Sequence, residues 1–175
     1  MYDKMNNEQK VLKILFENPT TKFHLRELAR ILRLNPNTII NITKILEKDK
    51  LILKEKKKYI TDIYADIENK KFTIKKKLFN LGQIYESGII NFLIEKYKPE
   101  AISLIGSYAT GEDIEKSDID IVIITKIKED SDMARYEKIL NRKIHLITTD
   151  YKEMSNEFYI NLINGILLYG YINKK

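Results

Sequence analysis

Apolar positions in the first fifty residues follow a helical period in three successive segments. Residues 8–17 have helical apolar spacing and end at the breaker cluster Asn18-Pro19-Thr20-Thr21. Residues 24–33 carry one apolar stripe at i, i+3, i+4 and i+7, made of Leu25, Leu28, Ala29 and Leu32. Asn35 is a favourable N-cap and Pro36 suits the first helical position, so a third helix is predicted to run to about Asp49.

A strand pattern follows the three helices. Leu51 to Lys54 and Tyr59 to Tyr64 are β-branched or aromatic stretches on either side of Glu55-Lys56-Lys57-Lys58, which predicts a hairpin with a basic tip. The order of three helices and a hairpin is typical of a winged helix-turn-helix, which we assign to residues 1–66. Residues 67–98 are predicted to form a helical linker and the first helices of a second domain, ending at Lys98-Pro99.

The remaining residues, 99–175, alternate between strand and helix. Strands are predicted at 101–105, 118–125 and 143–148, with a short helix at 132–140. A final helix is predicted from Ser155 to Tyr169, ended by Gly170. Its residues Phe158, Leu162, Ile163, Ile166 and Leu167 lie at helical spacing, which favours core packing or a homodimer seam. The predicted fold class is therefore α/β (α+β), a winged helix-turn-helix followed by a small mixed-sheet domain.

Composition limits the expected cellular location and the kind of metal site. Apolar residues make up 43% and charged residues 32% of the chain, no apolar run is long enough to span a bilayer, and the residues after Met1 do not form a signal peptide. We expect a cytoplasmic protein that does not enter a membrane. Cysteine is absent and the histidines are His24 and His145, so a metal would be held mainly by oxygen. The net charge of +6 favours a polyanionic partner such as nucleic acid.

The third predicted helix has a polar face suited to DNA. Asn37, Asn41, Lys44 and Lys48 lie opposite an apolar face made of Ile39, Ile42, Ile45 and Leu46. Asn can bond an adenine edge and Lys can meet guanine or a phosphate, while Lys56 and Lys57 at the hairpin tip could reach backbone phosphates. Double-stranded DNA is the expected partner; the alternative is a solvated face on a protein-docking or dimerisation module. The core pattern over residues 8–64 resembles winged-helix regulators of bacteria and archaea.

The most informative chemistry lies between residues 105 and 121. A strand turns at Gly106, where the backbone can approach a phosphate, and Ser107 adds a hydroxyl and an amide at a helix start. In the next strand Asp118 and Asp120 project from one face while Ile119 and Ile121 enter the core. These paired carboxylates lie beside Gly106 and Ser107, which we call the phosphate seat. Together they suit Mg²⁺ with a nucleotide, which indicates nucleotidyl transfer.

This string resembles the Gly-Ser and Asp-x-Asp signature of the DNA polymerase beta superfamily, especially its minimal nucleotidyltransferases, which include antitoxins that act as protein adenylyltransferases. The resemblance covers about residues 85–150. It implies that Gly106 and Ser107 hold the triphosphate of ATP or another NTP, that Asp118 and Asp120 bind Mg²⁺, and that Gly111 shapes the loop. The sequence departs from the pattern where Tyr108 and Thr110 replace arginines. Asn141-Arg142-Lys143-Ile144-His145 then places His145 at the position of the third carboxylate, which serves as metal ligand and base. Asp113 and Asp150 are weaker candidates for that role.

Three functions remain open from the sequence. The leading hypothesis is a DNA-docked enzyme that transfers AMP from Mg-ATP to a hydroxyl on a partner protein, which the antitoxin-type relatives suggest is a HEPN-type toxin. The second is a transcriptional regulator whose nucleotidyltransferase domain is weak or inactive and senses a nucleotide or a partner, because His145 replaces an acid. The third is a small-molecule nucleotidyltransferase, for which the short C-terminal region leaves little room.

Overall fold

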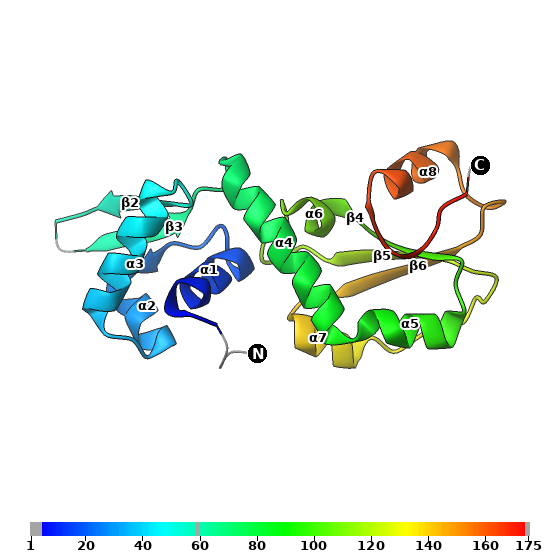
Figure 1. Ribbon diagram of the computed structural model, residues 1–175, viewed down its shortest axis with the longest axis horizontal. Coiled ribbons are helices and arrows are strands. Elements are labelled where there is room, and N and C mark those ends of the chain that lie inside the picture. The colour runs from blue at the N-terminus through cyan, green and yellow to red at the C-terminus, as the bar shows by residue number, and fades with distance from the viewer. Residues whose placement is uncertain (1–4, 59, 174–175) are drawn as a thin grey trace. The chain divides into compact units, whose positions relative to one another are not determined.

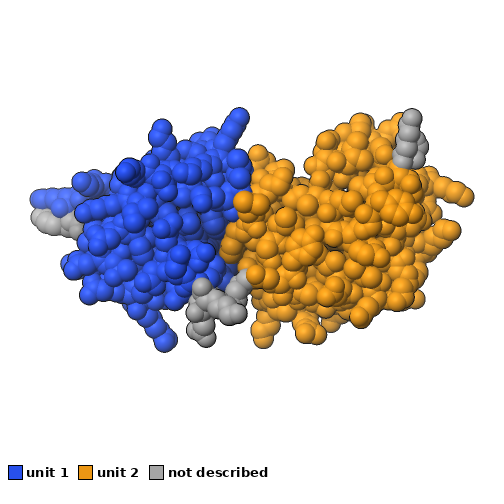
Figure 2. Space-filling model, viewed as in Figure 1, with its two compact units in different colours: residues 1–76 blue, residues 77–175 orange. Residues whose placement is uncertain are grey.

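The chain forms two compact units, residues 1–76 and 77–175, coloured separately in Figure 2. The computed structural model describes residues 5–58 and 60–173, and each unit contains its own β-sheet (Figure 1). Tyr59, predicted to start a hairpin strand, lies outside the described residues, as do residues 1–4 of the segment considered for a signal peptide. Within the described part of the chain, every helix is too short or too polar to cross a membrane.

The first unit contains three helices and a small antiparallel sheet. The helices are α1 (Asn7–Glu17), α2 (Leu25–Leu32) and α3 (Pro36–Lys48), each within a residue or two of its predicted bounds. The strands are β1 (Phe23–His24), β2 (Ile52–Lys56) and β3 (Thr61–Ala65), in the order β1-β3-β2. Strands β2 and β3 pair antiparallel, as predicted for the hairpin.

Helix α3 starts as its sequence predicts but buries a different set of side chains. The side chain of Asn35 caps the helix by accepting a hydrogen bond from the Asn37 backbone N–H at 2.8 Å. The prediction that Ile45 faces the core is wrong, because its side chain is 51% exposed while Thr43 is buried. Ile45 lies four positions after Asn41 and so shares the solvent face of that residue. The other predicted core residues of this helix, Ile39, Ile42 and Leu46, are buried.

A buried carboxylate ties the hairpin tip to the start of α2. Asp62 on β3 has a side chain only 3% exposed, and its Oδ2 accepts a hydrogen bond from Lys57 Nζ at 2.6 Å. Its Oδ1 lies 2.5 Å from His24 Nδ1. The hydrogen bond from Lys57 is the largest of the effects that lower the pKa of Asp62, and the hydrogen bond from His24 acts in the same direction.

The second unit is a four-stranded mixed sheet with helices on both faces. Helix α4 (Lys70–Ser87) crosses the boundary between the units and leads into α5 (Ile89–Tyr97). The remaining elements are β4 (Ala101–Ile105), α6 (Gly106–Thr110), β5 (Ile119–Ile124), α7 (Ala134–Leu140), β6 (Ile144–Thr149), α8 (Asn156–Ile163) and β7 (Ile166–Gly170). The sheet order is β6-β5-β4-β7, with β5 and β6 parallel and the other pairs antiparallel.

Side-chain alternation along β5 divides the core into two layers. Ile119, Ile121 and Ile123 pack in one cluster with residues of α5 and α7. Val122 and Ile124 pack in a second cluster with Leu162 of α8. Helices α5 and α7 therefore cover one face of the sheet, and α8 covers the other (Figure 1). Even-numbered positions of β5 face α8.

The prediction of one helix from Ser155 to Tyr169 is wrong. Helix α8 ends at Ile163, and the chain returns as β7, which pairs antiparallel with β4. Gly165 permits the reversal because a Cβ at this position would lie 2.6 Å from the Leu104 carbonyl oxygen. The predicted apolar stripe is accordingly divided: Phe158 and Leu162 pack on the sheet, Ile166 lies in β7, and Ile163 and Leu167 are about half exposed.

Candidate functional site

The centre of the candidate site is a carboxylate and an imidazole on neighbouring parallel strands. Asp120 of β5 and His145 of β6 are register partners, and Asp120 Oδ1 lies 3.0 Å from His145 Nδ1. Their side chains are 32% and 63% exposed, while Ile119 and Ile121 on either side of Asp120 are fully buried. The buried isoleucines fix the strand, so the polar pair is held on the sheet face that α8 covers in part.

The pairing leaves one nitrogen of His145 available for chemistry. When Nδ1–H donates to Asp120, Nε2 keeps its lone pair and can act as a proton acceptor or a metal ligand. A carboxylate that orients an imidazole in this way also sets its tautomer. The arrangement therefore has the parts of a general base held at a fixed position.

Gly106 lies against the Asp120 carboxylate, on the side away from His145. Its φ of +72° lies in the left-handed region, and a Cβ at this position would stand 2.7 Å from Asp120 Oδ2. The carboxylate of Asp120 thus fits between His145 and the α-carbon of Gly106. This close approach is the physical reason for glycine at the end of β4.

A buried hydrogen-bond network supports the turn that follows Gly106. Asn80 of α4 donates through Nδ2 to the Tyr108 carbonyl oxygen at 3.0 Å and to Asp113 Oδ1 at 2.7 Å. Gly111, at φ +82°, ends α6, and its N–H donates to the Ser107 carbonyl oxygen at 2.9 Å. Asp113 is 2% exposed and belongs to the buried hydrogen-bond network that supports the loop, so this candidate acid does not face solvent.

The remaining acidic candidates differ in their surroundings. Asp118 is exposed directly before β5 and borders a hollow of about 440 Å³, whose lining includes Glu137 and Lys138 of α7 as well as Arg142 and Lys143 but not Asp120. Asp150 follows β6, and hydrogen bonds from the backbone N–H groups of Lys152 and Glu153 lower its pKa. Asp150 therefore stabilises a turn, whereas Asp118 remains open to a ligand.

The residues present fit a magnesium-bound nucleotide better than a metal held by protein alone. Among residues 5–58 and 60–173, no three His, Asp or Glu side chains form a group that could hold a metal ion. Asp118 and Asp120 offer hard oxygen donors, and Mg²⁺ commonly uses one or two carboxylates with phosphate oxygens and water. The space that Gly106 leaves is occupied by the Asp120 carboxylate, which is thereby held against the turn that starts α6.

The two arginine positions of the resembled pattern are occupied by residues with other roles. Tyr108 is 4% exposed and belongs to the larger core cluster of the second unit. Thr110 Oγ1 lies 3.1 Å from both the Ser107 carbonyl oxygen and Glu112 Oε2, two acceptors that share its single hydroxyl proton. Neither side chain supplies positive charge to a triphosphate.

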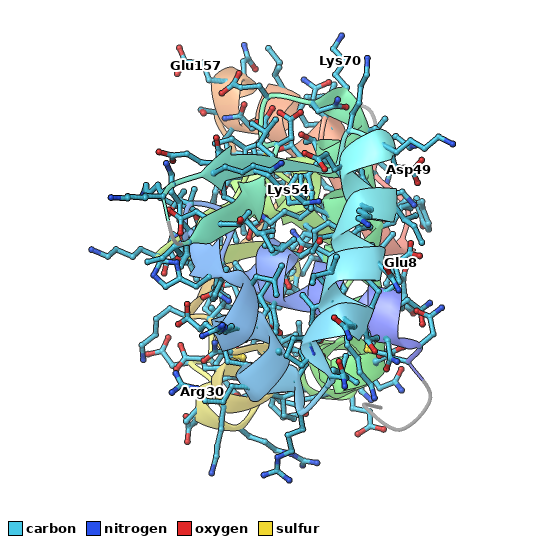
Figure 3. The ribbon with its side chains drawn as sticks, turned by 90° about the vertical axis from the view of Figure 1, so that its left-hand side faces the viewer. Glu8, Arg30, Asp49, Lys54, Lys70 and Glu157 are labelled. Atoms are coloured by element: carbon cyan, nitrogen blue, oxygen red, sulfur yellow. The ribbon has the colours of Figure 1, made fainter. Side chains whose placement is uncertain are left out.

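The predicted DNA-contacting residues all lie on the surface of the first unit, whose α2 and α3 side is seen in Figure 3. They are Asn37, Asn41, Lys44, Lys48, Lys56 and Lys57. Two basic groups of the hairpin are already paired, since Lys57 bonds Asp62 and Lys54 Nζ lies 2.8 Å from Glu47 Oε2. Residues 1–76 carry 18 Lys and Arg against 10 Asp and Glu, whereas residues 77–175 carry 13 against 15. The positive charge of the protein therefore resides in the first unit.

Sequence reasoning missed two carboxamides beside the Gly106 turn. Asn161 and Asn164 line a hollow of about 400 Å³ together with Gly106 and Ser107. A continuous helix through Tyr169 would have carried the end of α8 away from this turn. The signal that could have revealed them is Asn164-Gly165, a dipeptide typical of turns, inside the predicted helix.

Comparison with known proteins identifies relatives of the second unit. The family described as polymerase beta, nucleotidyltransferase matches residues 87–172. Two proposed protein adenylyltransferases of Methanocaldococcus jannaschii are similar to this chain. One is 39% identical over 84 residues, which is 44% of this chain and 82% of the relative. The other is 43% identical over 63 residues, which is 32% of this chain and 71% of the relative. No solved structure gave a significant match.

Proposed function

The chain belongs to the polymerase beta nucleotidyltransferase family, and from this membership we propose that its second unit transfers AMP from Mg-ATP to a hydroxyl group on a partner protein. The names of the two relatives support the choice of a protein as acceptor. The observation that carries the proposal is the Asp120 carboxylate, which lies between His145 and Gly106 and is flanked along β5 by the buried Ile119 and Ile121.

Each residue of the site has a distinct task in this proposal. Gly106 and Ser107 receive the phosphates, and Asp118 and Asp120 hold Mg²⁺ through oxygen. When bound, Mg²⁺ supplies positive charge that offsets charge developing on the phosphates. The acceptor oxygen forms a bond to the α-phosphorus, the bond to the β-phosphate breaks, and pyrophosphate leaves. His145 Nε2 takes the proton of the acceptor hydroxyl, while Asp120 holds the imidazole through Nδ1.

A binding experiment tests the aspartate assignments. Asp118→Asn and Asp120→Asn should each weaken Mg-ATP binding roughly tenfold or more, since a contact to a charged group is worth about 1.5–3 kcal/mol. Calorimetry with and without Mg²⁺ measures the effect, and Asp150→Asn is the control because the Asp150 carboxylate accepts its hydrogen bonds from its own turn. Equal Mg-dependent affinity in the wild type and the Asp118/Asp120 double variant would reject the site.

Substitutions of His145 separate catalysis from binding. His145→Ala should abolish transfer of labelled AMP yet leave Mg-ATP binding largely intact, because a base acts on the acceptor and not on the phosphates. His145→Asp restores the acid of the family pattern and should raise Mg-dependent transfer. An unchanged transfer rate in His145→Ala would remove this residue from the mechanism.

A second candidate function follows from the imidazole at the third acidic position. In this alternative the second unit binds Mg-ATP as a signal and the first unit regulates transcription. His145 favours it, because a neutral imidazole is a poorer ligand for Mg²⁺ than a carboxylate. Mg-ATP binding without transfer to any protein of a cell extract would support this alternative over the enzyme.

For the first unit we propose a winged helix-turn-helix that binds double-stranded DNA, with α3 in the major groove and the β2–β3 hairpin as the wing. Four observations support this proposal: the helix order, the exposed Asn and Lys face of α3, the exposed Lys56, and the excess of basic residues in residues 1–76. Lys57 serves mainly to hold the wing through Asp62. Dimerisation on a two-fold symmetric DNA site is consistent with such a module.

Salt dependence tests DNA binding directly. Lys44→Ala and Lys48→Ala should each weaken binding to all duplexes and lower the slope of log affinity against log salt by about one. Asn41→Ala should instead change which sequence is preferred. The control is Lys10→Ala, on α1. Absence of duplex binding at low salt would leave the unit as a protein-docking module, with a HEPN-type toxin as the first partner to test.

A further inference from the structure

The turn between α8 and β7 places two carboxamides beside the proposed phosphate seat. Strand β7 pairs with β4 so that Ile166 is the register partner of Leu104, two residues before Gly106. The turn that carries Asn164 and Gly165 therefore lies next to Ile105 and Gly106. Gly165 fits against Leu104 and Ile105 because it has no side chain. Ser103 strengthens the junction, since its hydroxyl donates to the carbonyl oxygen of Ile166 at 3.2 Å.

The resulting hollow has the size and lining of a small-molecule site. Its volume is about 400 Å³, and its walls include Ile105, Gly106, Ser107, Glu112, Asn161 and Asn164. Such volumes fall within the range of about 300–1,000 Å³ typical of ligand pockets. Ile105 is half-buried and gives an apolar wall, while Asn161 and Asn164 are exposed. Both amides line the hollow and are solvent-exposed, so they are available to a ligand.

We propose that this hollow holds the base and ribose of the nucleotide, and that Asn161 and Asn164 read the base edge and favour adenine. The inference rests on the proposed function, because the phosphate seat at Gly106 and Ser107 fixes which end of the ligand enters. A carboxamide has a donor beside an acceptor and so complements the N6 and N7 positions of adenine. Guanine presents two acceptors, O6 and N7, at the corresponding positions, so a carboxamide that binds the N7 edge forms two hydrogen bonds with adenine and one with guanine.

An acceptor side chain of the partner protein is the other ligand that could enter this hollow, and its hydrogen-bonding needs differ from those of a base. A tyrosine or serine needs one hydrogen bond and must approach His145, whereas the two carboxamides lie beside the Gly106 turn on α8 and the turn that follows it. The two carboxamides are neutral donor–acceptor groups, which suit an uncharged heterocycle, and Glu112 on the wall of the hollow adds a hydrogen-bond acceptor. The proposal thus assigns base selection to residues outside the Gly-Ser and Asp-x-Asp segments.

The test compares binding of four ligands to the full chain by calorimetry in Mg²⁺: ATP, GTP, UTP and inorganic tripolyphosphate. Wild type should prefer ATP. Asn161→Ala and Asn164→Ala should each weaken ATP binding about fivefold, which corresponds to about 1 kcal/mol for a neutral hydrogen bond. Their affinity for tripolyphosphate, which has no base, should not change. Asn91→Ala is the matched control, because Asn91 is an exposed Asn on α5, which covers the opposite face of the sheet.

The outcomes distinguish this inference from the proposal on which it rests. Wild type that binds all nucleotides and tripolyphosphate alike, or Asn variants that keep the full preference for ATP, would overturn the base assignment and leave the phosphate site standing. Wild type that binds neither nucleotide nor tripolyphosphate would overturn the proposed function and this inference together. Equal losses in the Asn variants for ATP and tripolyphosphate would also contradict base reading, because they would indicate a general distortion of the site.

Discussion

Gly106→Ala tests whether the space beside Asp120 is essential to the site. Two effects contribute to the expected loss of folding stability in this variant. A left-handed φ of +72° costs an Ala about 1–2 kcal/mol, of which about 0.4–1 kcal/mol is offset by the lower entropy of the unfolded chain. The new Cβ would stand 2.7 Å from Asp120 Oδ2, so the Asp120 side chain must rotate, at about 0.5–1.5 kcal/mol for an unfavourable rotamer. The expected total loss of stability is about 1–2 kcal/mol.

Gly88→Ala is the control because it shares the first effect and lacks the second. Gly88 has a φ of +78°, and a Cβ added there would have no neighbouring atom within 4 Å. Both variants should therefore lower the melting temperature of the second unit by several degrees, since 1 kcal/mol corresponds to roughly 4–8 °C in a domain of this size. Only Gly106→Ala should lose Mg-ATP binding, because only there is the carboxylate displaced. Thermal unfolding and calorimetry measure the two quantities. Full Mg-ATP affinity in Gly106→Ala, or an equal loss in Gly88→Ala, would refute the reasoning.

Three further predictions concern stability. Gly82→Ala should stabilise the protein by about 0.5–1 kcal/mol, because Gly82 lies inside α4 with open space around it; a lower melting temperature would show that this glycine has another role. Asn80→Ala should cost about 2–3 kcal/mol in chemical unfolding, since it removes donors to the Tyr108 carbonyl and to buried Asp113; a loss below about 0.5 kcal/mol would contradict that support. Asp62 has a lowered pKa when folded, so its contribution is present above its unfolded pKa and is lost as the pH falls through the folded value. Asp62→Asn should accordingly flatten the acid side of the stability curve, and an unchanged slope in acid would exclude Asp62 as a source of acid sensitivity.

Local sequence signals were sufficient where one short segment determines the structure. Asn35 and Pro36 start α3 because a cap and a fixed φ act within a single turn. The alternation of aspartates and isoleucines in residues 118–121 likewise predicted a strand with one polar face, although Asp118 precedes the first residue of β5. The neighbouring position of Asp120 and His145 was anticipated from the family resemblance, which sets His145 at the third acidic position, and the two residues are register partners on parallel strands.

Local sequence signals failed where contacts between residues far apart in the chain determine the structure. The apolar spacing after Ser155 is compatible with a long helix, and only the space available against β4 makes Gly165 a point of reversal. Ile45 was assigned to the core because it lies three residues after Ile42, yet it shares the solvent face of Asn41 and is 51% exposed. Pairing of Lys57 with Asp62 depends on the fold of the hairpin and has no local pattern. Asn161 and Asn164, the proposed base-reading residues, were missed because the final helix was predicted to continue to Tyr169.

The pairing of β4 with β7 also has a consequence for the order in which the second unit acquires its parts during folding. Ser103 and Ile166 are bonded across 63 positions of the chain, whereas Asp120 and His145 are bonded across 25. Closing the larger loop costs more conformational entropy, so we expect the contact between β4 and β7 to form after the contact between β5 and β6. A molecule arrested before β7 docks would thus possess its carboxylate and imidazole without the carboxamide wall. Such an intermediate would capture tripolyphosphate but treat all nucleotides alike, so base discrimination would mark the completion of folding.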